Sequence, residues 1–420
     1  MTDIWLASTN VVINLLVVFL PMLAVGFAVV VWLSYRRTKW QYERVNGKLF
    51  EIITPPEVRK SPQAIELILG GFFDKSYGSK LQMLIDGRVP IHFSLEIVSL
   101  AGEIKFFMWI PEKFEKVAKS GFYAQYPQVE IVEVEDYAQP ILERRNKYQM
   151  WGGGFQTSQS DDNSLPTYKE YKLEDNPDVE NTIDPFSSLL EYMGTLGYGE
   201  MCWIQLILRG DHALTWKKAA APPWKNSDTL KDRIEKKIDK IKEGARVNPL
   251  SGDTEEKSGL YNFEPGKADD IKDLRSRQGK FHFNAVMRAA YIADKEHFDG
   301  FNIPSMIKSL QQFGKAGANT IGPRWETDFD DPVKDMARVS KWVRNYYLNK
   351  KSSDEFDYLK TYVRRSGIYE PHVNQQLKPF TLSTDEIATL FHLPSTAVTT
   401  PTLKRTDARK ADPPGNLPTG

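Results

Sequence analysis

The sequence predicts an α+β protein in which an N-terminal transmembrane helix precedes two α/β units of ferredoxin-like type. Three observations support this fold class. A long run without charged residues lies near the N-terminus, the order helix–strand–strand–helix–strand occurs twice, and 41% hydrophobic with 26% charged residues is typical of a folded chain. At ~150 residues per domain, a chain of 420 residues has room for two or three domains.

Residues 11–33 carry no charge, and as a helix they would reach ~34 Å, enough to cross the hydrocarbon core of a bilayer. Three basic residues follow, Arg36, Arg37 and Lys39, whereas the first ten residues carry only Asp3. The positive-inside rule then places the N-terminus outside and the bulk of the chain in the cytoplasm. A cleaved signal peptide would need a basic start, a shorter apolar run and a small-residue cleavage site, and these are missing. Residues 1–40 are therefore predicted to be a single-pass anchor in the cytoplasmic membrane.

The first α/β unit is predicted within residues 41–150. Its helix at 61–74 can begin with Ser61 as cap and Pro62 in the first turn. Two β-rich stretches in 91–111 meet at Ala101-Gly102, which indicates a hairpin. A helix at 112–127 and an alternating strand at 129–137 complete the unit.

A second unit is predicted at 184–330, after a linker at 151–183. The linker begins with "WGGGFQTSQSDDNSLP" (151–166), a composition typical of loops. The elements expected in the second unit are a helix at 184–197 capped by Asp184, strands at 200–210 and 280–293, a helix at 302–314 and a strand at 318–325.

An insert, 211–279, replaces the hairpin between the first two strands of the second unit. It contains a predicted helix, 227–244, with one apolar stripe: Leu230, Ile234, Ile238 and Ile241. This stripe could dock a partner protein or pack within its own domain, and we favour the second interpretation.

Residues 331–394 are predicted to be a helical closing segment. A helix is expected at 332–349, and "STDEIATLFHLP" (383–394) has a capping box from Ser383 to Glu386. Apolar residues become rare beyond Pro394, so 395–420 is predicted to be a flexible linker.

Motifs that carry chemistry are missing from the sequence. The nearest match to a phosphate-binding loop, "GLYNFEPGKA" (259–268), has two residues too many between its glycines and Ala268 where a hydroxyl is needed. The six histidines lack metal-ligand spacing, and Cys202 alone excludes an internal disulfide and reads as a small buried hydrophobe. We therefore predict no catalytic, cofactor-binding or metal-binding residues and no enzymatic activity in this chain.

Nucleic-acid contact has a local signal only, because 55 basic residues balance 55 acidic ones. Basic and aromatic residues alternate in "RVSKWVRNYYLNKK" (338–351) and "YLKTYVRRSGIY" (358–369). The side chains that could meet phosphate are Arg338, Lys341, Arg344, Arg364 and Arg365, with Lys350 and Lys351 beside them. A cytoplasmic helix with a solvated basic face is the alternative, and we favour it.

Three stretches, 112–137, 182–208 and 380–403, resemble the N-terminal half of membrane-anchored bacterial ATPases related to type IV secretion and conjugation coupling proteins. "PPGNLPTG" (413–420) resembles the linker that precedes the nucleotide-binding domain in that family. The resemblance covers roughly residues 11–420 and is most specific at "FYAQYP" and "EIATLFHLP". It implies homo-oligomers, typically hexamers, that move DNA or protein through a membrane.

None of that family's catalytic residues occurs in this sequence, so the resemblance implies an anchoring and adaptor role. The ATPase motor would lie further along the same polypeptide or on a separate one. Two alternatives remain: a membrane-tethered scaffold that uses the insert, and an uncharacterised membrane enzyme. The adaptor hypothesis predicts that deleting 395–420 disconnects a motor, whereas the scaffold hypothesis predicts that deleting 227–244 abolishes function.

Overall fold

The computed structural model describes residues 2–43, 47–54, 58, 60–74, 79, 82, 85–89, 91–174, 184–211, 229–244, 266–315, 319–327, 341–367 and 379–394. Side chains at 2–16, 18, 34, 38, 41–43 and 341–350 are outside this description. The predicted tail, 395–420, also lies outside it, as does most of the insert between the two helices described below.

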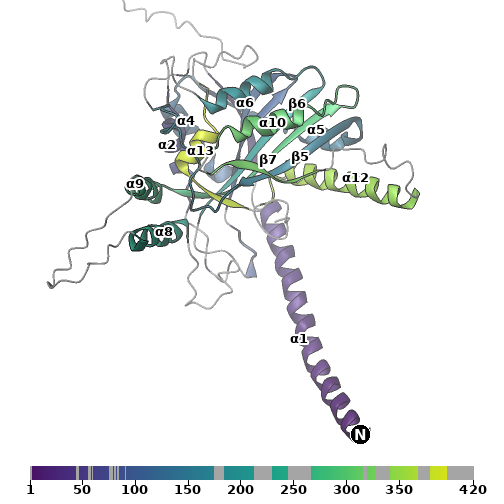
Figure 1. Ribbon diagram of the computed structural model, residues 1–420. Coiled ribbons are helices and arrows are strands. Elements are labelled where there is room, and N and C mark those ends of the chain that lie inside the picture. Colours follow the sequence, from purple (N-terminus) through teal and green to yellow (C-terminus); the bar gives the residue numbers. More distant parts are fainter. Residues whose placement is uncertain are drawn as a thin grey trace, which may run out of the picture.

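The fold is mixed α+β and is built on one nine-stranded antiparallel sheet (Figure 1). Eight strands follow the order β4-β1-β3-β2-β6-β7-β5-β8, and β9 pairs with β7 beside this path. The strands are β1 (Gly47–Ile53), β2 (Phe93–Leu100), β3 (Glu103–Pro111), β4 (Glu130–Val134), β5 (Tyr148–Thr157), β6 (Glu200–Gly210), β7 (His282–Asp294), β8 (Ile321–Glu326) and β9 (Phe380–Ser383).

The two halves of the sheet repeat one connection. The first half runs β1-α2-β2-β3-α4-β4 and has the strand order β4-β1-β3-β2, while the second runs β5-α6-β6-β7-α10-β8 and has the order β8-β5-β7-β6. Their helices are α2 (Gln63–Gly71), α4 (Glu112–Gln125), α6 (Pro185–Gly194) and α10 (Asn302–Gln311). The halves join where β2 pairs with β6, from Phe93↔Leu208 to Leu100↔Met201. The predicted recurrence of helices and strands is therefore present, with one additional strand at the start of each half.

The prediction of a loop beginning at 151 is wrong for 151–157. These residues belong to β5, which pairs with β7 on one side and β8 on the other. The glycines that suggested a loop have a packing role, because a Cβ on Gly152 would lie 2.6 Å from the ring of Tyr358. Glycine within a strand often marks such a close approach.

Local signals at the turns and helix ends are confirmed, with one exception. Ala101 and Gly102 form the β2–β3 turn with positive φ values of 52° and 85°, the conformation that two-residue hairpins prefer. Asp184 caps α6 by accepting a hydrogen bond from the Phe186 amide, at 2.9 Å. The exception is Ser61, since the N-cap position of α2 is one residue later, at Pro62, and has no side-chain cap.

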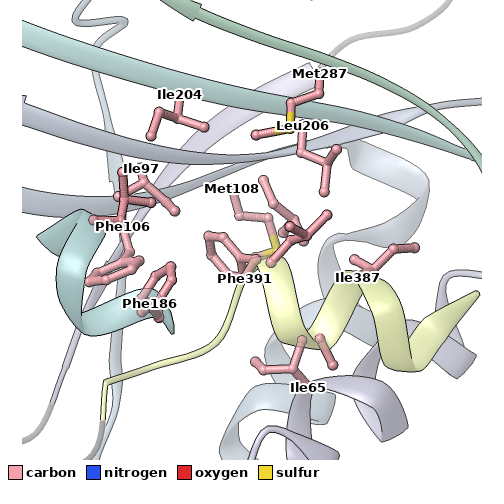
Figure 2. Packing of buried hydrophobic residues seen from close by; sticks show 14 of the residues in the cluster. Ile65, Ile97, Phe106, Met108, Phe186, Ile204, Leu206, Met287, Ile387 and Phe391 are labelled. Carbon is pink, nitrogen blue, oxygen red and sulfur yellow. The ribbon is translucent and has the colours of Figure 1, made fainter. Parts of the chain in front are cut away.

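The main core lies between one face of the sheet and helices α2, α4, α6, α10 and α13 (Thr384–Leu390). Figure 2 shows its centre, where Phe391 and Ile387 approach Met108 and Leu206 of the sheet, with Ile65 of α2 nearby. A second cluster covers the opposite face, where α5 (Gln139–Glu143) and α12 (Lys341–Val363) pack. The two halves of the sheet thus share both cores.

The apolar stripe of the insert is buried within the chain. On α8 (Leu230–Gly244), Leu230, Ile234 and Ile238 pack against Leu274 of α9 (Lys267–Gln278). The interpretation of a stripe that packs within its own domain is therefore confirmed. Figure 1 shows the two helices together at one side of the sheet.

The helix predicted at 332–349 differs in its bounds. Residues 332–340 lie outside the described residues, and α12 continues from Lys341 to Val363. The buried residues Tyr358, Leu359 and Tyr362 lie beyond the predicted end at helical spacing and fix the last turns of α12 on the sheet.

Helix α1 (Thr2–Glu43) contains one stretch, Phe19–Arg37, that is long and apolar enough to cross a membrane. The structure agrees with the predicted anchor in one respect: the described residues contain one long apolar helix, and it lies near the N-terminus. Its C-terminal end contacts the folded body, since Trp40 packs against Val89, Ile207 and Val286.

Candidate functional site

The C-terminal segment 379–394 lies inside the fold, where other parts of the chain surround it. Strand β9 pairs with the first residues of β7, from His282↔Ser383 to Ala285↔Phe380. The remainder of β7 pairs on the same side with β5, which ends its pairing at Phe155↔Met287. Strands β9 and β5 therefore pair with successive parts of the same edge of β7. Every residue from 380 to 394 is buried.

We call the groups that hold this segment the C-terminal clasp: the loop 158–173, Arg277 of α9, Glu66 of α2 and Asp184, the N-cap of α6. Each comes from a different element, so the clasp forms only when both halves of the fold are assembled. Its apolar part includes an edge-to-face contact between Phe391 and Phe106, with ring centroids 5.9 Å apart.

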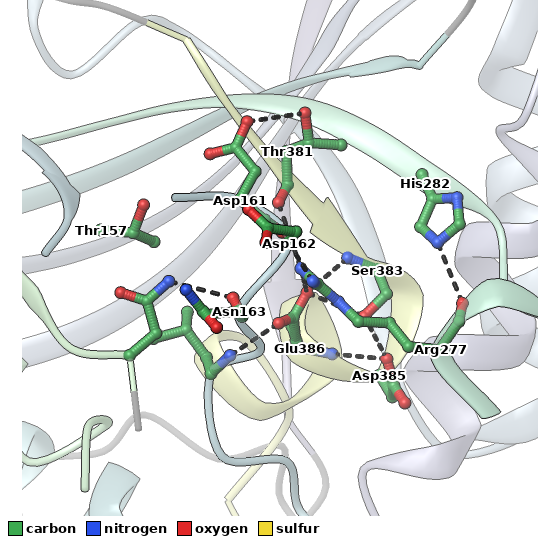
Figure 3. A network of polar contacts seen from close by, with 12 residues as sticks. Thr157, Asp161, Asp162, Asn163, Arg277, His282, Thr381, Ser383, Asp385 and Glu386 are labelled. Atoms are coloured by element: carbon green, nitrogen blue, oxygen red, sulfur yellow. Dashed lines mark hydrogen bonds and ion pairs between the residues drawn. The ribbon is translucent and has the colours of Figure 1, made fainter. Parts of the chain in front are cut away.

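The centre of the clasp is a buried ion pair between Arg277 and Glu386, with 2.9 Å from Nη2 to Oε2 (Figure 3). The Glu386 carboxylate also accepts hydrogen bonds from the amides of Ser383 and Leu165, both at 2.7 Å. The bond from Ser383 belongs to the predicted capping box, which is confirmed. One side chain thus joins α13, α9 and the loop 158–173.

Further polar contacts of the clasp lie on both sides of this ion pair. The Tyr168 amide donates to the Thr389 hydroxyl at 2.8 Å, and the Tyr168 hydroxyl donates to Glu66 at 2.8 Å. At the far end, His392 Nε2 lies 3.1 Å from Asp184 Oδ2. Burial raises the pKa of the Asp184 carboxyl, but His392 and the Phe186 amide outweigh burial, and the net shift is downward.

The insert is attached to the clasp through charged contacts. Arg233 of α8 lies 3.3 Å from Asp161, and Lys237 of α8 lies 3.5 Å from Asp162. Arg277 Nη1 also donates to the Asp161 carbonyl at 2.6 Å. The helical insert therefore supports the loop 158–173, which in turn covers the C-terminal segment.

The opposite face of the sheet carries a second buried polar network, at the end of α12. Arg365 Nε donates to Glu96 Oε1 at 3.0 Å, and its Nη1 is paired with Asp136. Burial opposes ionisation of Glu96, but the Arg365 guanidinium outweighs it and lowers the pKa of that carboxyl. Arg288 of β7 donates to the Thr361 carbonyl at 2.8 Å, so α12 is joined to two strands.

Of the five predicted phosphate contacts, only Arg364 and Arg365 have side chains among those that the structure describes. Arg338 lies outside the described residues, and Lys341 and Arg344 belong to α12 without described side chains. Arg364 is exposed at the end of this helix. Arg365 does not lie on the surface, as a phosphate contact would require: its φ of 46° turns the chain, and the side chain is 2% exposed between two acids.

A groove beside α12 contains basic residues that the sequence analysis did not group. It has a volume of about 490 Å3, and its charged lining consists of Arg145, Lys295, Lys351 and Glu355. These come from the short helix η1 (Arg145–Lys147), the residue that follows β7, and α12. Only Lys351 was among the basic residues noted in the sequence, because the groove combines segments that are far apart along the chain.

Cys202 is fully buried, with its Sγ 3.4 Å from Met306 Sδ, and burial raises the pKa of its thiol. The prediction of a buried, unreactive cysteine is confirmed for its position. Among the described residues there is no group of three or more His, Cys, Asp or Glu side chains that could hold a metal ion.

Comparison of the chain with known protein families and with curated proteins gives no match in either case.

Proposed function

We propose that this chain is the membrane-anchored adaptor of an ATPase that translocates DNA or protein, of the type IV secretion and conjugation kind. One observation carries the proposal: the N-terminal helix packs on the face of β7 at Val286, and the C-terminal segment pairs with the edge of β7 up to the neighbouring residue, Ala285. The motor would follow residue 420 in the same polypeptide or associate as a separate one.

The attachment of α1 is specific. Trp40 packs on Ile207 and Val286, Arg36 Nε donates to the Ile85 carbonyl at 3.3 Å, and Arg36 lies 3.7 Å from Asp86. Because side chains alternate along a strand, Val286 points to the face opposite that of Ala285, the residue that pairs with Phe380 of β9. A force between the membrane and the chain beyond residue 394 would therefore pass through neighbouring residues of β7.

The central place of β7 suits such a mechanical role. Strand β6 pairs with β7 from Gly210↔Phe283 to Glu200↔Ala293, while β5 and β9 pair with its other edge. A strand bonded along both edges moves only with its sheet. The anchor and the C-terminal segment are thus expected to move as one body.

We further propose that each half of the sheet is a ferredoxin-like unit, since both halves have the connection βαββαβ and the same strand order. The basic residues that follow the apolar run support an orientation with the folded part in the cytoplasm. A homo-oligomer, hexameric by the resemblance to coupling proteins, is part of the same proposal.

The test is to purify the full chain in detergent from its native membranes and to identify P-loop ATPases that co-elute in stoichiometric amounts. A P-loop in the coding sequence beyond Gly420 would serve the same purpose. Deletion of 395–420 should remove the ATPase without releasing the chain from the membrane, whereas deletion of 227–244 should leave the ATPase bound. Absence of any stoichiometric ATPase, in cis or in trans, would contradict the proposal.

The scaffold alternative has less support from the structure. It requires the apolar stripe of α8 as a docking surface, and three residues of that stripe are buried against α9. A partner that is lost on deletion of 227–244 but retained on deletion of 395–420 would favour the scaffold.

A further inference from the structure

Helices α1 and α12 contact the same face of the sheet. On β7, Val286 belongs to the cluster against which Trp40 of α1 packs, while Ala290 and Ile292 share a cluster with Tyr358 and Leu359 of α12. These three β7 residues are separated by even numbers of positions, so their side chains point to one side. Figure 1 agrees, since α1 leaves the sheet on the side where α12 lies, away from α6 and α10.

This face lies close to the end of the apolar stretch of α1. Phe19–Arg37 ends three residues before Trp40, a rise of ~4.5 Å along a helix. If α1 crosses a bilayer, as the proposed function requires, the face bearing α12 is the one turned toward the headgroups. A helix is ~10 Å thick, so α12 and the groove beside it would lie at the membrane surface.

The groove has the chemistry of an anion site. Arg145 stacks on Phe356, with its guanidinium carbon 4.4 Å from the ring centroid, an arrangement that occupies the flat face of the guanidinium and leaves its N–H edge for an acceptor. Lys295 and Lys351 are both near the Glu355 carboxyl and act to lower its pKa, but burial is the larger influence and raises it. Three cations and one carboxyl group therefore line the groove, and the nearby Asp354 carboxylate also raises the pKa of Glu355.

We propose that this groove binds the phosphodiester headgroup of an anionic membrane lipid and so fixes the orientation of the folded body on the bilayer. The volume of about 490 Å3 is within the range of small-molecule sites, ~300–1,000 Å3. The inference rests on the proposed membrane anchoring but not on the presence of a motor.

A nucleic-acid backbone presents the same phosphodiester chemistry, but the position of the groove favours lipid. Ile292, which lines the groove, lies six residues along β7 from Val286, a distance of ~20 Å at 3.3 Å per residue. Lipid headgroups would surround α1 at this distance, whereas a DNA duplex, roughly 20 Å wide by its groove dimensions, would have to enter between the sheet and the bilayer.

The experiment uses the full chain in nanodiscs of pure phosphatidylcholine or of phosphatidylcholine with phosphatidylglycerol at 7:3. A Ser352→Cys variant carries a fluorophore in the groove, and buried Cys202 does not compete for the label. Quenching by acrylamide, a neutral solute, reports access from water. We expect phosphatidylglycerol to protect the label and phosphatidylcholine to leave it accessible.

Charge reversal tests the groove directly. Lys295→Glu with Lys351→Glu should abolish the protection, since each basic side chain near an anionic surface strengthens attraction about fivefold and the loss of two lowers headgroup affinity at least ~25-fold. The glutamine versions should give a smaller loss, which separates charge from damage to the fold. Lys116→Glu with Lys308→Glu is the matched control, because both lysines are exposed on α4 and α10 at the opposite face.

Three results would overturn the proposal. Equal quenching in the two lipids would show that no anionic headgroup enters the groove. Protection by a double-stranded oligonucleotide in phosphatidylcholine discs, without an effect of phosphatidylglycerol, would assign the groove to nucleic acid. A chain that fails to float with vesicles of either composition would contradict membrane anchoring itself, whereas loss of the ATPase partner alone would leave the lipid site intact.

Discussion

Replacing Glu386 with glutamine should release the C-terminal segment from the fold. The substitution keeps the size of the side chain but removes its charge, and the side chain is 1% exposed. The glutamine would offer one carbonyl oxygen to the donors that now share a carboxylate: Arg277 at 2.9 Å and the amides of Ser383 and Leu165 at 2.7 Å. Its own NH2 group would face one of these donors.

Removing one partner of a buried ion pair lowers the free energy of unfolding by about 3–5 kcal/mol, because the other charge is left buried without compensation. At 1.4 kcal/mol for each factor of ten, the opening of β9 should become roughly 10²–10³ times more frequent. Hydrogen exchange of the buried amides in 380–391, measured on the full chain in detergent, reports this opening.

Two further variants make the result interpretable. Glu103→Gln is the matched control: Glu103 lies 3.6 Å from Lys105 and its side chain is 47% exposed, so the loss should stay below about 1 kcal/mol. Adding Arg277→Met to Glu386→Gln should restore part of the protection, since the buried cation is then gone. If Glu386→Gln changes exchange by less than tenfold, or no more than Glu103→Gln does, the clasp is not held by this ion pair.

Three other predictions follow from the same structure. Gly152→Ala should displace Tyr358 and cost about 1–3 kcal/mol as overpacking does, seen as faster hydrogen exchange in α12 with β9 unaffected; unchanged exchange there would contradict the packing argument. Burial lowers the pKa of both His92 and His282 from 6.5 to about 4, so the unfolded chain binds more protons between these values. Stability should therefore fall as pH drops from 6.5 toward 4, by up to about 1.4 kcal/mol per pH unit for each histidine, and His282→Asn should reduce the slope in urea titrations. Cys202 should react with a maleimide only under denaturing conditions, and rapid labelling of the folded chain would refute its burial.

The sequence predicted those elements whose local signals agree with their final surroundings. The strand expected at 200–210 is β6, and the helix expected from Asp184 is α6. Strand β5 was missed because its glycines serve the approach of a helix more than 200 residues away. No signal within "WGGGF" could reveal that distant partner.

The candidate sites were less predictable, since they depend on contacts between distant segments. The capping box at Ser383 was visible, but the Arg277 partner of Glu386 was not. Arg364 and Arg365 look alike in sequence, yet only the first is exposed, because a positive φ turns the second toward Glu96. The basic groove likewise draws its three cations from separate elements.

The position of β9 also affects how the chain can be synthesised. The edge of β7 at 282–285 stays open until residues 380–383 have been made, which is nearly 100 residues later. An open strand edge can pair with another chain and cause aggregation. A nascent chain leaves the ribosome with its N-terminal end first, so the residues added last are still held inside it. Residues up to 394 can therefore reach the clasp only after residues beyond 394 have been added. Translation of those residues would thus determine when the sheet becomes complete.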